Sequence, residues 1–88
     1  MYRVLVSRTF QKQYSNLSKS EQKRIKSALN YLIENPFDPR PGADIKPLAG
    51  TDPQKYRLRV GDYRIIYCID IKLVKVIEVF KRGRGYRK

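Results

Sequence analysis

Positively charged side chains recur at every second position between residues 55 and 60. Lys55, Arg57 and Arg59 alternate there with apolar residues, so in a β-strand the cations project from one face and the apolar side chains from the other. An arginine guanidinium is a planar fork that binds two phosphate oxygens at once. The pattern therefore predicts a row of cations that can bind phosphate groups.

A second basic cluster follows at the C-terminus. Residues 55–88 hold eleven basic and three acidic residues, a net charge of +8, whereas the net charge of residues 1–54 is +4. Most of the formal net charge of +12 on the 88 residues thus lies in the C-terminal part. Such a balance is typical of proteins that bind nucleic acid, an acidic membrane surface or an acidic protein. The tail reads Lys81-Arg82-Gly83-Arg84-Gly85-Tyr86-Arg87-Lys88.

The charged row also has a simpler interpretation, because an ordinary solvent-exposed strand face has the same pattern. We favour phosphate binding for two reasons. We expect the row to have no acidic partners, and in the second cluster Tyr86 can stack on a base. The basic face of the helix expected over residues 19–34 has two interpretations as well: solvent exposure, or contact with RNA or an acidic partner.

The residue types that the chain lacks exclude several kinds of catalysis. Without His there is no histidine general base, no histidine metal ligand and no serine-protease-like triad. The single Cys68 excludes a disulfide framework and a cysteine zinc site, and we expect no metal and no cofactor. The longest apolar run has five residues, against the roughly 20 that span a membrane. We therefore expect a cytoplasmic protein with no signal peptide and no membrane partner.

The first half of the chain shows a helical period. An apolar stripe that follows Ser7, a helix-capping residue, predicts a helix over about 8–16. The capping-box spacing of Ser18 and Glu21, with a second stripe, predicts a longer helix over about 19–34. The two stripes consist of Phe10, Tyr14 and Leu17, and of Ile25, Ala28, Leu29, Leu32 and Ile33.

The N-terminus and the second half show the period of two that is typical of β-strands. Gly61-Asp62 is a turn signal of the two-residue hairpin type, and Asp70-Ile71-Lys72 is expected to turn the chain again. Strands are predicted over residues 2–6, about 55–60, about 63–70 and about 73–81.

All five prolines lie between residues 36 and 53, which predicts a long connection. Ile45 and Leu48 are expected to pin this connection to the core, in a very short strand. The resulting order is β-α-α-β-β-β, an α+β fold in which two N-terminal helices pack on one face of a small, mainly antiparallel sheet. Residues 1–88 are expected to form a single domain, because neither half has enough apolar residues for a core of its own.

Two runs of sequence resemble the core signature of the RelE/ParE superfamily, the toxins of type II toxin–antitoxin pairs. The predicted order of elements and the chain length match as well, so the resemblance covers the whole chain and implies the fold of these toxins. The runs are Lys46-Pro47-Leu48-Ala49-Gly50 and Lys55-Tyr56-Arg57-Leu58-Arg59-Val60-Gly61-Asp62-Tyr63-Arg64-Ile65-Ile66-Tyr67.

RelE-like members are ribosome-dependent endoribonucleases that cut mRNA in the ribosomal A site, whereas ParE-like members poison DNA gyrase. RelE-like toxins use a basic cluster on the sheet together with an arginine and a tyrosine near the C-terminus, and this chain has a counterpart of each. The resemblance therefore implies a RelE-like, metal-independent mRNA endoribonuclease that inhibits translation. The implied catalytic residues are Arg57, Arg59, Arg64, Arg82 and Tyr86, and the further cations expected to bind RNA are Lys46, Lys55, Lys81, Arg84 and Arg87.

Cleavage of RNA by its own 2′-OH needs a base for that hydroxyl, positive charge around the phosphorane and an acid for the leaving 5′-oxygen. Concentrated cations supply the positive charge around the phosphorane. The chain departs from the family pattern in having Arg57 and Arg59 where relatives often have lysines. An arginine stays protonated and is a poor general base, so we expect these two to act electrostatically. The base is left open between Tyr86, a ribosomal group and partial proton transfer through Arg57.

The resemblance also implies partners. These are a cognate RelB-like antitoxin, in a heterodimer or heterotetramer, and mRNA in the A site of the 70S ribosome. The helix over 19–34 and the edge of the sheet are the surfaces on which we expect the antitoxin. Two other functions stay open as alternatives, a ParE-like inhibitor of DNA gyrase and a non-catalytic, nucleic-acid-binding relic of a toxin.

Overall fold

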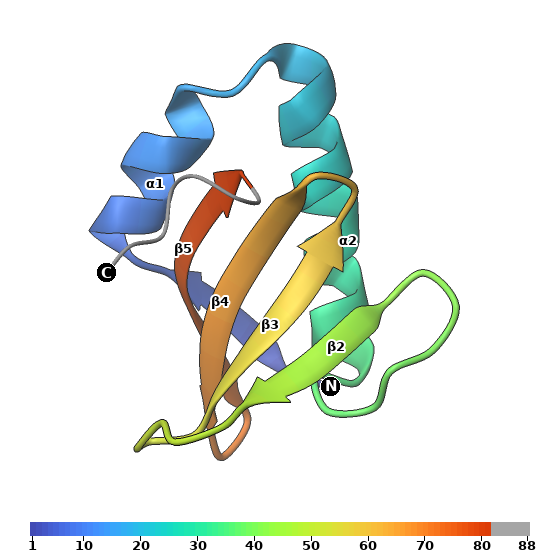
Figure 1. Ribbon diagram of the computed structural model, residues 1–88, viewed down its shortest axis with the longest axis vertical. Helices are drawn as coiled ribbons and strands as arrows, with labels where there is room; N and C mark the ends of the chain where they lie inside the picture. Colours follow the sequence, from blue (N-terminus) through green and yellow to red (C-terminus); the bar gives the residue numbers. More distant parts are fainter. Residues whose placement is uncertain (82–88) are drawn as a thin grey trace.

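The computed structural model describes residues 1–81, which form a mixed sheet of five strands with two helices on one face (Figure 1). The elements are β1 (Arg3–Val6), α1 (Arg8–Ser15), α2 (Lys19–Glu34), β2 (Asp44–Leu48), β3 (Lys55–Val60), β4 (Tyr63–Asp70) and β5 (Leu73–Lys81). The strands lie in the order β1-β5-β4-β3-β2, and only the β1–β5 pairing is parallel. The predicted α+β architecture is confirmed.

Both helices begin at the predicted caps. The Ser7 hydroxyl accepts a hydrogen bond of 2.9 Å from the backbone N–H of Phe10, which satisfies a free donor at the start of α1. At α2 the Ser18 and Glu21 side chains each accept from the other's backbone N–H, a complete capping box. The bounds of α2 are those predicted, and α1 ends one residue earlier than predicted.

The core lies between the helices and the sheet face that they cover. Each element turns its apolar stripe into this layer, and burying one such side chain contributes roughly 1.5–3 kcal/mol. The buried apolar cluster consists of Phe10, Ile25, Ala28, Leu32, Ala43, Ile45, Leu58, Ile65, Tyr67, Val74, Val76 and Val79.

Within residues 1–81 no helix is both long and apolar enough to cross a membrane.

The proline-rich connection contributes a strand of its own. Ile45 is buried and fixes β2 to the core, as predicted, so the short strand is confirmed and the order of elements becomes β-α-α-β-β-β-β. The same prediction was wrong for Leu48, which is half-buried outside the core cluster because strand alternation puts it on the face opposite Ile45. The predicted order β-α-α-β-β-β lacked this strand. The strand β2 contains Pro47, which cannot donate to a neighbour, and it lies at the edge of the sheet, where that donor is not needed.

A β-bulge interrupts the pairing of β4 with β5. Ile66 lies opposite Glu78, but the next residue, Tyr67, lies opposite Val76, so Ile77 is the extra residue. Before the bulge the even-numbered residues of β5, such as Val76, face the core; after it, odd-numbered residues such as Val79 do so. The bulge therefore decides which face each residue near the end of β5 occupies.

A hydrogen bond between α2 and the sheet makes the stability of the fold pH-dependent. The Tyr63 hydroxyl donates to a Glu21 carboxylate oxygen at 2.7 Å. This bond, more than any other interaction, lowers the pKa of Glu21 below its ordinary value of 4.5. It also raises the pKa of Tyr63 above 10.0.

Tyr63→Phe is therefore expected to destabilise the protein near neutral pH and to have less effect in acid. The Glu21 contribution is present above pH 4.5 and is lost as the pH falls through the lowered pKa. The Tyr63 contribution is present below pH 10.0 and is lost as the pH rises through the raised pKa. Urea unfolding of both proteins across this pH range measures the difference. A difference that stays constant with pH would show that the bond does not form in solution.

Candidate active site

The sheet face away from the helices presents the basic row in register across three strands. Arg59 of β3 lies directly opposite Arg64 of β4, and Arg57 follows two residues along on the same face of β3. Residues directly opposite one another in a sheet share a face and lie close together. We call Arg57, Arg59 and Arg64 the arginine cluster. Lys46 of β2 lies opposite Arg57, and Lys55 continues the row along β3.

The members of the cluster differ in exposure. The Arg57 side chain is only 10% exposed, whereas that of Arg59 is 42% exposed. The Nη1 atom of Arg57 is buried, and within residues 1–81 no hydrogen-bond acceptor reaches it. Buried polar atoms are nearly always hydrogen-bonded, so this donor has an unused bonding capacity that an anion on the arginine cluster could satisfy after a small movement of the side chain. A phosphate oxygen is the acceptor that a guanidinium fork fits best.

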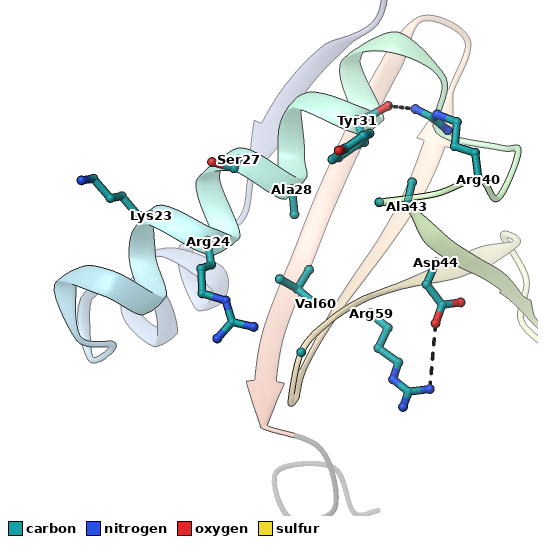
Figure 2. A pocket seen from close by; sticks show the side chains of 12 residues that line it. Lys23, Arg24, Ser27, Ala28, Tyr31, Arg40, Ala43, Asp44, Arg59 and Val60 are labelled. Atoms are coloured by element: carbon teal, nitrogen blue, oxygen red, sulfur yellow. Dashed lines mark hydrogen bonds and ion pairs between the residues drawn. The ribbon is translucent and has the colours of Figure 1, made fainter.

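An aspartate lies beside two members of the cluster. One carboxylate oxygen of Asp44 is 3.8 Å from Nη1 of Arg57. The other is 3.9 Å from Nη1 of Arg59, and Figure 2 shows this second pair. The expectation that the row has no acidic partners was wrong. The strand β2 places Asp44 directly opposite Arg59, although the two are far apart in the sequence. Both distances are longer than a hydrogen bond, so Asp44 attracts the guanidinium groups without occupying their donors.

Comparison with known proteins decides the family. The model of the family described as the ParE toxin of type II toxin–antitoxin systems, parDE, matches residues 3–86. The chain belongs to the RelE/ParE superfamily of toxins. No curated protein matches the toxin at a significant level.

Solved structures of type II toxins share the fold. RelE in the archaeal RelE–RelB complex of Pyrococcus horikoshii OT3 is 33% identical to the toxin, with a TM-score of 0.80 over 96% of this chain and 98% of that chain. RelE in the RelB–RelE complex of Methanococcus jannaschii is 27% identical, with a TM-score of 0.70 over 88% of both chains. The isolated E. coli RelE toxin is 26% identical, with a TM-score of 0.77 over 97% of this chain and 88% of that chain.

One predicted RNA-binding residue of the toxin lies away from the arginine cluster. Lys81 is opposite Tyr63, on the face of the sheet that the helices cover, and it is among the groups that lower the pKa of Glu21. Its neighbour Phe80 is opposite Arg64, on the face of the arginine cluster. The structure therefore brings together the predicted site residues of β2, β3 and β4 but does not bring Lys81 to them.

The other predicted site residues of the toxin lie outside the described residues. These are Arg82 and Tyr86, predicted to be catalytic, and Arg84 and Arg87, predicted to bind RNA. Within residues 1–81 no group of three His, Cys, Asp or Glu side chains could hold a metal ion. The arginine cluster can stabilise negative charge and position a phosphate.

Proposed function

We propose that the toxin is a ribosome-dependent mRNA endoribonuclease of the RelE type. The observation that carries this proposal is the arginine cluster, in which the buried Nη1 atom of Arg57 has no hydrogen-bond acceptor within residues 1–81. A buried donor that needs only a small movement to reach an anion stabilises charge with little reorganisation. The likeness to RelE from P. horikoshii, M. jannaschii and E. coli supports the same activity.

In the proposed reaction the scissile phosphate of mRNA lies against the arginine cluster. The 2′-oxygen attacks phosphorus as its proton passes to a base, and the bond from phosphorus to the 5′-oxygen then breaks, which leaves a cyclic phosphate. The 5′-oxygen takes up a proton. Arg57, Arg59 and Arg64 stay protonated and stabilise the doubly negative phosphorane. We assign Tyr86 of the C-terminal segment to a proton transfer and Arg82 to charge stabilisation, with Lys46 and Lys55 as phosphate contacts.

A RelB-like antitoxin is the proposed protein partner. Two of the similar solved structures are complexes of RelE with RelB, from P. horikoshii and M. jannaschii. The net charge of +12 gives an acidic partner a long-range attraction. Binding over the arginine cluster would neutralise the charge on which the proposed reaction depends.

Incubation with programmed ribosomes tests the proposal. Mapping of mRNA 5′ ends is expected to show codon-spaced cuts that vanish when ribosomes are omitted. The family model carries the ParE name, so the second candidate is inhibition of DNA gyrase, and a supercoiling assay belongs in the same experiment. Inhibition of supercoiling without any RNA cut would reject the nuclease and support the second candidate.

Replacing Asp44 by asparagine is expected to tighten RNA binding by about threefold to tenfold. The change removes a negative charge close to Arg57 and Arg59 and keeps the side-chain shape. Anisotropy titrations with a non-cleavable RNA at low salt measure the effect. Asp38→Asn is the matched control, because Asp38 is exposed on the connection before β2 and makes no ion pair within residues 1–81. Equal gains in both variants would mean that only net charge matters.

A further inference from the structure

A groove of about 620 Å³ opens between α2 and the ends of β2 and β3 (Figure 2). Among the described residues, its lining holds four basic side chains and one carboxylate, that of Asp44. Four cations against one carboxylate leave the lining positively charged. That carboxylate is itself already beside Arg57 and Arg59. Such a concave, positively charged surface attracts anions.

The four cations of the groove have different roles. Arg40 is held by the protein itself: its guanidinium donates hydrogen bonds of 2.7 Å to the backbone oxygens of Tyr31 and Asp38. It also lies over the Tyr31 ring, 5.5 Å from the centroid, so that ring face is covered and cannot stack on a base. Lys23 points away from the groove in Figure 2. Arg24 and Arg59 are therefore the cations that can hold a ligand there.

Arg24 reaches from α2 across to the turn that follows β3. A Cβ atom added to Gly61 would overlap its Nη2 atom, so the absence of a side chain at Gly61 lets the guanidinium lie against the turn. Arg24 is exposed, and within residues 1–81 no hydrogen bond or ion pair engages its guanidinium. Its donors are thus available at the mouth of the groove, on the side where Arg59 also projects (Figure 2).

Arg59 connects the groove to the arginine cluster, because it belongs to both. We propose that the groove binds the sugar–phosphate backbone of the RNA strand where that strand continues beyond the arginine cluster, with Arg24 as its main contact. The identity of the strand rests on the proposed function. An RNA strand is favoured over an acidic polypeptide because one continuous polyanion can bind both surfaces through Arg59. Since Arg40 covers one face of the Tyr31 ring and no other aromatic side chain among the described residues lines the groove, the contact is expected to read phosphate and not base sequence.

Binding of 2′-O-methyl oligouridylates, which cannot be cleaved, tests the groove without catalysis. For an oligonucleotide of about 12 nucleotides, within the range of single-strand sites, Arg24→Ala is expected to weaken binding by about tenfold at low salt. The slope of log K against log salt should fall by about 0.7, the value for one lost phosphate contact to a single strand. The mononucleotide 2′-O-methyluridine 3′-monophosphate, which has a single phosphate, should bind the arginine cluster of both proteins equally.

Lys26→Ala is the matched control for charge. Lys26 is exposed on the same helix but lines a separate, apolar groove against α1, and its removal should leave the salt slope unchanged. Equal effects of Arg24→Ala and Lys26→Ala would overturn the proposal, as would unchanged binding of the longer oligonucleotide. The proposal would also be overturned if Arg24→Ala weakened the binding of polyglutamate but left RNA binding unchanged. That result would assign the groove to an acidic polypeptide.

The programmed-ribosome assay separates this inference from the proposed function. If wild-type toxin cuts mRNA and Arg24→Ala binds the longer oligonucleotide normally, the groove assignment fails and the nuclease stands. If the wild-type toxin cuts nothing but Arg24→Ala loses affinity and salt slope as expected, the nuclease fails and the groove stands as a site for an RNA backbone.

Discussion

Arg57→Met is expected to lower ribosome-dependent mRNA cleavage by about 10²–10³-fold, the range for losing one fixed donor of an anion-binding site. Arg57 is the most deeply buried member of the arginine cluster, and its Nη1 atom meets no acceptor within residues 1–81. Methionine keeps an unbranched apolar stem at this buried position, and replacing a buried charge by an apolar side chain is often neutral for stability. The loss should therefore arise from charge, not from unfolding.

Two further variants show whether the activity lost in Arg57→Met depends on charge, on the planar guanidinium fork or only on net charge. Arg57→Lys keeps the charge but not the planar fork, so it should recover part of the activity if charge dominates and little if two-point binding dominates. Lys12→Ala removes one exposed charge on α1, far in the sequence from the cluster, and controls for net charge. Single-turnover cleavage on programmed ribosomes is the measurement. Wild-type rates for Arg57→Met would remove the arginine cluster from the catalytic site.

The sequence was sufficient to predict the two helices and the three central strands, because each carries an unambiguous local signal. Capping at Ser7 and Ser18 sets the helix starts, and the strict alternation in β3 places Arg57 and Arg59 on one face. These signals act over a few residues and need no tertiary information. The basic row was therefore predictable at the level of individual residues.

Asp44 was missed because its role depends on pairing between strands that are distant in sequence. The strand that carries it contains Pro47 and has only a few residues, so its periodicity is weak. A signal did exist: if Ile45 faces the core, its neighbour Asp44 must face the other way, toward the row. What the sequence does not give is the register that puts Asp44 opposite Arg59.

Lys81 was predicted to bind RNA as the first residue of the basic tail. The face that it occupies depends on the bulge in β5, which shifts the alternation by one residue between Val76 and Val79. Without the extra Ile77, Lys81 would lie on the face of the arginine cluster. Both valines are buried, and their odd spacing was the sign of the shift in the sequence.

Tyr67→Ala is expected to lower the free energy of unfolding by about 3–5 kcal/mol, the usual cost of truncating a buried aromatic residue. Tyr67 is fully buried, and its ring stacks on Tyr56 with centroids 5.5 Å apart. Small domains have a total stability of about 5–15 kcal/mol, so the loss is a large fraction of the whole. Urea unfolding followed by circular dichroism measures it. A cost below about 1 kcal/mol would mean that the site collapses around the truncated side chain.

Tyr67→Phe separates packing from the hydrogen bond and connects stability to the candidate site. The Tyr67 hydroxyl donates at 2.8 Å to the backbone oxygen of Pro36, the first proline of the connection that leads to Asp44. Removing the hydroxyl leaves that buried oxygen without its donor, at a cost of about 1–3 kcal/mol, while the ring still fills the core. Because this bond fixes the start of the connection, Tyr67→Phe should also weaken the ion pairs of Asp44 with Arg57 and Arg59. RNA affinity should then move toward that of Asp44→Asn, whereas a purely local defect would leave the affinity unchanged.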